Sequence, residues 1–132
     1  MTEPFLWPTR VYYEDTDAGG VVYYANYLRF MERARTEWLR AVGVEQDRLR
    51  AEQEVIFVVV AVEIQFSSPA KFNDSLEVSV KVTELNNASL TFAQDVTRDG
   101  KLLCHATVRV ASVVPETLKP RRLPSQVKQA ML

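Results

Sequence analysis

Two residue types that build most metal centres and catalytic triads are almost missing from this sequence. Cys104 is the single cysteine and His105 the single histidine among 132 residues. One cysteine excludes an internal disulfide and suits a reducing compartment, so we expect a cytoplasmic protein. The two side chains are too few for a Cys/His zinc site within one chain, and a Ser-His-Asp triad would need His105 as its base. We therefore predict neither a metal nor a cofactor.

Long apolar runs and an excess of one charge are also absent. No stretch approaches the roughly 18 apolar residues of a membrane-spanning helix, and the first residues lack the basic and apolar regions of a signal peptide. The 16 basic and 17 acidic residues nearly cancel, which argues against a nucleic-acid-binding protein. A chain of 132 residues fits one domain, which we place at residues 1–132.

The spacing of apolar residues predicts one long helix. From Tyr27 to Val42 they recur at intervals of three and four, with Asn26 as the expected N-cap and Gly43 as the residue that ends the helix. A second, shorter helix is expected over Gln46–Glu52. The long helix is the only segment that is both long and apolar enough to cover a sheet.

Alternating apolar and polar residues predict strands in the rest of the chain. The first is expected at Thr9–Glu14, and four more follow the helices at about 60–66, 76–83, 90–96 and 102–110. Asn86-Asn87 and Asp99-Gly100 mark tight turns. Cys104 falls in an apolar row and is expected in the core, whereas His105 falls on the opposite, exposed side. The sequence thus predicts an α+β fold, a curved antiparallel sheet wrapped around one helix, with edges that invite self-association.

The C-terminal segment, 117–132, is basic and contains prolines that should prevent regular structure. It carries no acidic residue and four basic ones, Lys119, Arg121, Arg122 and Lys128. Two interpretations stay open, a solvated tail and an arm that binds phosphate or a membrane surface, which would place the protein peripherally at the inner membrane.

The most polar and aromatic segment is 12–27. Glu14, Asp15 and Asp17 lie within four positions, next to Gly19-Gly20 and just before the N-terminus of the long helix. Crowded carboxylates shift their pKa values upward where they are desolvated, and N–H groups at a helix N-terminus bind an oxyanion. A carboxylate beside such donors is a minimal acyl-transfer site. The alternative is a capped acidic loop without a catalytic role.

Several segments resemble hotdog-fold acyl-CoA thioesterases, and most closely the YbgC branch, which many Gram-negative bacteria encode beside the Tol-Pal envelope system. The matching segments are DTDAGGVVY at 15–23, ANY at 25–27, ERAR at 32–35, FSSPA at 66–70, DSLEV at 74–78 and KPR at 119–121. The resemblance implies a hotdog fold and dimers whose sheets join edge to edge, often paired into tetramers, with active sites between subunits.

The resemblance also implies roles for residues of the polar segment. The catalytic aspartate of the family falls on Asp17, and Asp15 takes the loop-structuring position. Gly19 and Gly20 are expected to bind substrate. Tyr13 matches a tyrosine of YbgC-type sites, but a packed strand aromatic is an equal interpretation.

Tyr24 departs from the branch, which usually has histidine at this position. The related 4-hydroxybenzoyl-CoA thioesterases carry tyrosine there. We expect Tyr24 either to donate a hydrogen bond to the substrate or to form a pocket wall. Because tyrosine titrates near about 10 and histidine near about 6.5, we predict no protonation limb at pH 6–7 from this position.

The expected reaction is hydrolysis of an acyl-CoA, with Asp17 acting as nucleophile or as general base. Val58, Val59 and Val60 could line a longer aliphatic acyl tunnel, whereas aromatic neighbours suit an aromatic or short acyl group. Lys119 and Arg121 are candidates for the CoA phosphates, and acidic acyl carrier protein is an alternative partner. A second hypothesis is a binding or scaffold protein of envelope or phospholipid metabolism, whose partner capture would survive Asp17→Asn.

Overall fold

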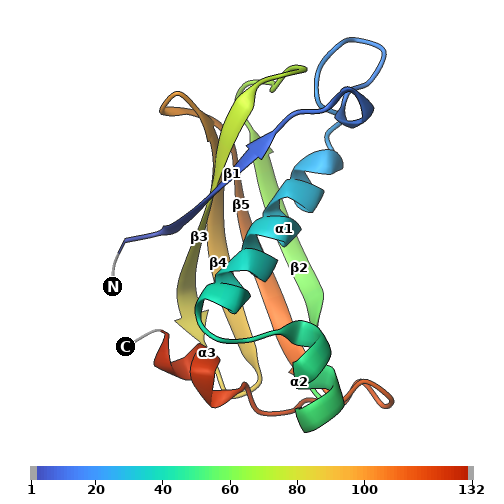
Figure 1. Ribbon diagram of the computed structural model, residues 1–132, viewed down its shortest axis with the longest axis vertical. Coiled ribbons are helices and arrows are strands. Elements are labelled where there is room, and N and C mark those ends of the chain that lie inside the picture. The colour runs from blue at the N-terminus through green and yellow to red at the C-terminus, as the bar shows by residue number, and fades with distance from the viewer. Residues whose placement is uncertain (1–2, 131–132) are drawn as a thin grey trace.

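The computed structural model describes residues 3–130 and contains one antiparallel sheet of five strands in the order β1-β3-β4-β5-β2 (Figure 1). The three strands at its centre are joined by tight turns, whereas β1 and β2 form the two edges. The strands are β1 (Phe5–Arg10), β2 (Ile56–Phe66), β3 (Ser75–Leu85), β4 (Ser89–Arg98) and β5 (Lys101–Val113).

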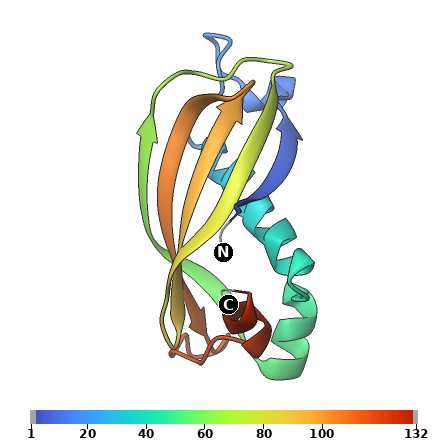
Figure 2. The same cartoon turned by 90° about the vertical axis from the view of Figure 1, so that its left-hand side faces the viewer.

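The long helix α1 (Asn26–Ala41) lies along one face of this curved sheet, as the two perpendicular views show (Figures 1 and 2). The shorter α2 (Gln46–Gln53) and α3 (Ser125–Gln129) lie at the lower end. This is the predicted α+β hotdog arrangement, so the fold prediction is confirmed. Within residues 3–130, none of the helices has the length and apolar character required to cross a membrane.

The face of α1 that meets the sheet carries the residues that the spacing predicted. Six of its residues are buried: Tyr27, Phe30, Met31, Ala34, Trp38 and Leu39. The Trp38 ring meets Phe92 of β4 edge to face, at 5.5 Å between ring centres. The helix ends where Gly43 adopts a positive φ of 95°. The N-cap prediction was wrong, because Ala25 occupies that position and the Asn26 side chain is used elsewhere.

The first strand begins and ends earlier than the alternation predicted. Instead of Thr9–Glu14, β1 covers Phe5–Arg10, and Tyr13–Asp15 forms a single 3₁₀ turn. The Asp15 carboxylate accepts the Tyr12 N–H at 2.8 Å, and this local bond turns the chain away from the sheet. Pro8 is tolerated in β1 because the strand lies at an edge.

Strand β5 places Cys104 in the core and His105 on the outer face, as expected. Cys104 is fully buried, and burial raises the pKa of its thiol to about 12, which makes it a poor nucleophile. His105 is half-exposed and lies 2.6 Å from Asp95. One detail differs: a register shift opposite Val96 and Thr97 buries Leu103 and leaves Leu102 exposed.

Strand β2 keeps its apolar residues largely uncovered. Val59, Val60 and Val62 are 49%, 55% and 38% exposed, because β2 pairs only with β5 and forms the sheet edge beside which no further strand lies among residues 3–130. These apolar side chains of β2 are therefore left uncovered in the single chain. A long apolar edge of this kind is a surface that proteins normally cover.

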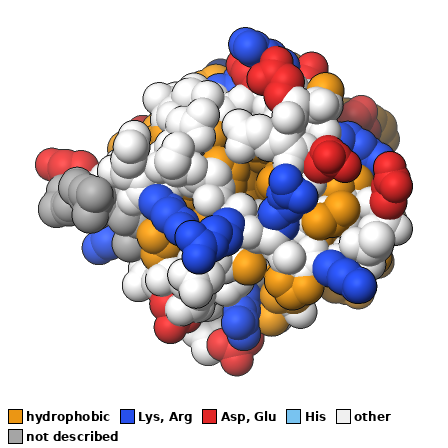
Figure 3. Space-filling view, turned by 90° about the horizontal axis from the view of Figure 1, so that it is seen from below, with side chains coloured by type: hydrophobic (Ala, Val, Ile, Leu, Met, Phe, Trp, Pro, Cys, Tyr) orange, Lys and Arg blue, Asp and Glu red, His pale blue; other side chains and the backbone are white. Residues whose placement is uncertain are grey.

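The C-terminal tail lies at the end of the molecule opposite the 13–25 loop (Figure 1). Arg121 N–H donates to the carbonyl of Ser112 at 2.9 Å, which holds the tail beside the end of β5. The expectation of no regular structure was wrong beyond Pro124, where α3 forms and buries Val127. Seen from this end, several Lys and Arg side chains stand out on the surface (Figure 3).

Candidate active site

The predicted catalytic residue, Asp17, lies in a tight turn above the N-terminus of α1. Its N–H donates to the carbonyl of Val21 at 2.9 Å, and the Gly20 N–H donates to the Asp17 carbonyl at 3.0 Å. Gly20 has a φ of +80°, which favours glycine. The Gly19 N–H donates to Asp17 Oδ1 at 2.9 Å. This bond fixes one carboxylate oxygen, and Oδ2 has no partner among residues 3–130.

The 3₁₀ turn before Asp17 is closed by hydrogen bonds among residues 12–16. Asp15 closes it through its bond to the Tyr12 N–H, and the Thr16 hydroxyl donates to the Tyr13 carbonyl at 2.7 Å. Asp15 thus has a structural position, as the resemblance implied. The three neighbouring acids are not desolvated in the single chain, since Glu14 and Asp17 are exposed and Asp15 is half-buried.

Asn26 connects this turn to α1, a role that the sequence analysis missed. Its side-chain amide donates to the carbonyl of Asp15 at 2.9 Å, and the Tyr23 N–H donates to the same oxygen at 3.0 Å. The carbonyl two residues before Asp17 is therefore held by both the start of the helix and the segment leading to it. An asparagine at the start of a helical pattern is typical of a cap, so the position of Asn26 alone did not reveal this bond.

The 67–74 loop supports the turn from the other side. The Tyr27 hydroxyl accepts the Ala70 N–H at 2.9 Å, and the Ala70 carbonyl accepts the Val22 N–H at 2.8 Å. Asp74 pairs with Arg98 at 2.6 Å. Partial burial opposes ionisation of Asp74, but the Lys71 N–H and the Arg98 guanidinium outweigh it and hold its pKa below the usual value.

Aromatic side chains surround an open pocket beside the turn. The Tyr24 ring is 63% exposed and lies 4.8 Å from the Tyr23 ring and 6.4 Å from the Phe66 ring, between centres. The adjacent Tyr24 hydroxyl raises the pKa of Tyr23, with a smaller contribution from the charge of Asp17. The pocket has a volume of about 260 Å³ and is lined by Val22, Tyr24, Tyr27, Phe66, Ser67, Ser68 and Pro69.

Comparisons with known proteins agree with this arrangement. The sequence matches the model of the thioesterase-like superfamily over residues 11–131. The chain belongs to the thioesterase-like superfamily. This thioesterase is 48% identical over 126 residues to acyl-CoA thioesterase YbgC of Haemophilus influenzae, covering 96% of the chain and 93% of that relative. The predicted membership of the YbgC branch and the thioester hydrolase class are confirmed.

Solved structures of other thioesterases superpose closely on this thioesterase. A probable thioesterase from Bartonella henselae has a TM-score of 0.89 at 38% identity, over 92% of this chain and 100% of that one. A complex of 4-hydroxybenzoyl-CoA thioesterase superposes with a TM-score of 0.90 at 18% identity, over 96% and 98% of the two chains. The second match concerns the fold alone.

The remaining predicted site residues of this thioesterase make no hydrogen bond to the Asp17 side chain among residues 3–130. The Tyr13 ring is 80% exposed and packs edge to face on Phe72, at 6.0 Å between centres. Val58 and Val59 lie near the start of β2, where Val58 pairs with Ala111 of β5. Lys119 and Arg121 lie in the tail, at the opposite end from the turn (Figure 1). Of the predicted site residues, Gly19 and Gly20 bond to Asp17 directly, and Tyr24 lines the nearby aromatic pocket. No cluster of metal-ligating side chains occurs within residues 3–130.

Proposed function

We propose that the chain hydrolyses acyl-CoA thioesters to the free acid and CoA, with Asp17 as the catalytic carboxylate. The observation that carries the proposal is the state of Asp17: the Gly19 N–H fixes one carboxylate oxygen, and the other has no partner among residues 3–130. Val22 and Tyr24, which follow the same turn, line the aromatic pocket. The name of the Haemophilus relative, acyl-CoA thioesterase, supports the same substrate class.

Thioester hydrolysis requires a correctly positioned carboxylate and a hydrogen-bond donor for the oxyanion, and little else from the protein. A thiol has a reference pKa of about 8.5, so the CoA thiolate leaves without strong help from a general acid. Asp17 either attacks the thioester carbonyl to form a mixed anhydride that water then cleaves, or takes a proton from the attacking water. In both routes the C–S bond breaks and the electron pair leaves with sulfur.

Backbone groups before α1 are suited to hold the oxyanion. The N–H groups of Tyr24 and Ala25 donate to no acceptor among residues 3–130, and they lie just before α1, at the positive end of its dipole. A donor of this kind contributes about 10²–10³-fold to a reaction rate. In this proposal Tyr24 serves with its N–H on the oxyanion and with its ring as a wall of the acyl pocket.

The pocket beside the turn favours a short or aromatic acyl group. Its walls are the rings of Tyr24, Tyr27 and Phe66, and its floor is the 67–69 segment. Flat rings offer stacking surface to an aromatic acyl group and apolar contact to a short aliphatic one. We propose these two classes as substrates in preference to long aliphatic chains.

Assembly would complete the site. We propose that two chains pair through their exposed β2 edges about a two-fold axis, which covers Val59, Val60 and Val62. Antiparallel pairing of two identical edges places the lower end of one chain beside the upper end of the other. Lys119 and Arg121 of one copy would then approach the Asp17 turn of the second copy, where CoA phosphates require cations. The same basic segment would suit an acidic acyl carrier protein, the alternative acyl donor.

The test is thiol release from a panel of thioesters that spans short aliphatic, long aliphatic and aromatic acyl groups, on CoA and on acyl carrier protein. The proposal predicts turnover of CoA esters, fastest with short or aromatic groups. No release from any CoA ester would contradict it, and release only from carrier-protein esters would replace CoA as the acyl donor.

A further inference from the structure

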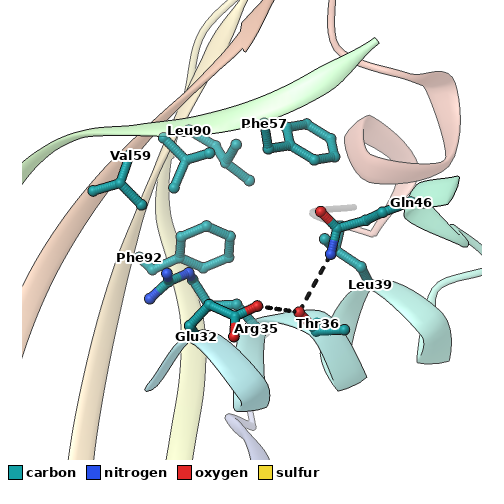
Figure 4. Close-up of a pocket in the computed structure, with 10 residues that line it drawn as sticks. Glu32, Arg35, Thr36, Leu39, Gln46, Phe57, Val59, Leu90 and Phe92 are labelled. Atoms are coloured by element: carbon teal, nitrogen blue, oxygen red, sulfur yellow. Dashed lines mark hydrogen bonds between the residues drawn. The ribbon is translucent and has the colours of Figure 1, made fainter. Parts of the chain in front are cut away.

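A second cavity, separate from the pocket beside Asp17, lies between α1 and the sheet. It has a volume of about 110 Å³. Its sheet side is apolar, formed by Phe57, Val59, Leu90, Phe92 and Val110, and its helix side carries the polar residues Glu32, Arg35 and Thr36 (Figure 4). An apolar cavity of about 150 Å³ is enough to take up benzene, so this cavity has room for a short carbon chain or much of one ring.

A fully buried amide stands behind this cavity. Gln94 is 0% exposed and occupies an inward position of β4, in the same row as the apolar Leu90, Phe92 and Val96. Its side-chain amide nitrogen, Nε2, donates to the carbonyl of Met31 at 3.1 Å and to that of Ser79 at 3.3 Å. These two bonds use both amide hydrogens, so the orientation of the amide is fixed and Oε1 is left for a donor.

Arg35 is that donor, and the buried amide holds it in place. Arg35 Nη1 donates to Gln94 Oε1 at 2.9 Å. Among residues 3–130, no carboxylate forms an ion pair with Arg35. Burial lowers the pKa of the guanidinium and the nearby Glu32 opposes this, but an arginine stays charged at neutral pH. The bond to Gln94 is the one hydrogen bond that the Arg35 side chain makes within residues 3–130, so most of its five N–H groups have no protein acceptor there.

The other polar side chains at the cavity, Glu32, Thr36 and Gln46, are linked to one another through the Thr36 hydroxyl. The Thr36 hydroxyl donates to Glu32 Oε2 at 2.7 Å and accepts from the Gln46 amide at 3.3 Å. Figure 4 shows these bonds on the right of the view, with the Arg35 guanidinium on the left, next to Phe92. The cavity thus presents the Arg35 guanidinium beside an apolar wall, with the exposed Glu32 carboxylate on the same helix side.

We propose that this cavity binds a small organic acid, with its carboxylate on the Arg35 guanidinium and its carbon chain or ring against Phe57, Leu90 and Phe92. A planar guanidinium matches a carboxylate with two parallel hydrogen bonds, and the match is strengthened where water is excluded. The acid replaces the water that a partly buried guanidinium otherwise needs. If the proposed function holds, acids of this class are also what the thioesterase releases.

Direct binding of butanoate and benzoate to the full chain tests the proposal, with butanamide and benzamide as neutral probes of the same shape. NMR spectra would follow the Arg35 Nε–H and the Gln94 side-chain amide during titration. The expected result is saturable shifts at both groups with the acids and none with the amides. Arg35→Met should weaken acid binding by at least about tenfold, whereas Arg33→Met, an exposed arginine of the same helix, should not.

Two further variants separate the possible failures. Arg35→Lys keeps the charge but not the fork, so it should fold and bind the acids more weakly than the wild type. Asp17→Asn should abolish turnover and leave acid binding unchanged, so failure of the proposed function would not affect this result. Three results would each overturn the proposal. They are equal binding of acids and amides, unchanged affinity in Arg35→Met and Arg35→Lys, and no binding at the solubility limit.

Discussion

Removing the Asn26 side-chain amide should slow catalysis while leaving the fold intact. In Asn26→Ala the Asp15 carbonyl loses the bond of 2.9 Å and keeps the Tyr23 N–H at 3.0 Å. One neutral hydrogen bond contributes about 0.5–1.5 kcal/mol, and the remaining partner prevents the carbonyl from being left unsatisfied. If that free energy holds Asp17 in its productive position, kcat should fall about two- to tenfold.

The assay is steady-state thiol release with the best substrate of the panel, together with Tm. Asn86→Ala is the matched control, because Asn86 donates a side-chain bond of 3.3 Å to Ser89 in an exposed turn far from Asp17. The expected result is a lower kcat with little change in KM for Asn26→Ala only. Unchanged kcat in Asn26→Ala, or equal losses in both variants, would refute the argument that Asn26 positions the catalytic turn.

Three further predictions concern Tyr24, Asp74 and β2. The reaction rate of the wild type should show no titration step at pH 6–7, and Tyr24→His should introduce a step near about 6.5. A step in the wild type that vanishes in Tyr24→Phe would contradict this. The pKa of Asp74 is lowered on folding, so its contribution to stability is present above the unfolded value of about 3.9 and is lost as pH falls. Asp74→Asn should therefore lower the free energy of unfolding by about 1–3 kcal/mol at pH 7, with the difference narrowing below about pH 4; a constant difference in urea unfolding would refute it. Val60→Lys should reduce the molar mass measured by light scattering if β2 edges pair, whereas Lys81→Ala on an inner strand should not.

Much of the fold could be predicted from the sequence because local patterns and packing agree. The apolar spacing of α1 matches its buried face, and the Asp99-Gly100 hairpin has positive φ at both residues, 51° and 79°. Two of the errors arose where a side-chain bond overrode alternation or propensity. Asp15 diverts the chain after β1, and Asn26 bonds to a distant carbonyl instead of capping its own helix.

Only those site residues that lie in one continuous segment of the chain could be predicted from the sequence. Asp17, Gly19, Gly20 and Tyr24 are close in sequence and also in space. Phe66, which forms a wall of the pocket, comes from a distant strand, and its exposure depends on β2 being an edge. Gln94 did leave a signal, a polar residue in the inward row of β4, but its partner Arg35 lies 59 positions away.

The central claim, that the Asp17 carboxylate drives thioester hydrolysis, is tested most directly by kcat/KM of Asp17→Asn beside Glu14→Gln. In the wild type the Gly19 N–H donates to Asp17 Oδ1 at 2.9 Å. The asparagine side chain keeps an oxygen that can accept this bond, so the turn should persist in Asp17→Asn. Glu14 is an exposed acid three residues away and serves as the charge-matched control. We predict a loss of at least about 10²-fold in Asp17→Asn and little change in Glu14→Gln. Activity of Asp17→Asn within a few-fold of the wild type would contradict the account.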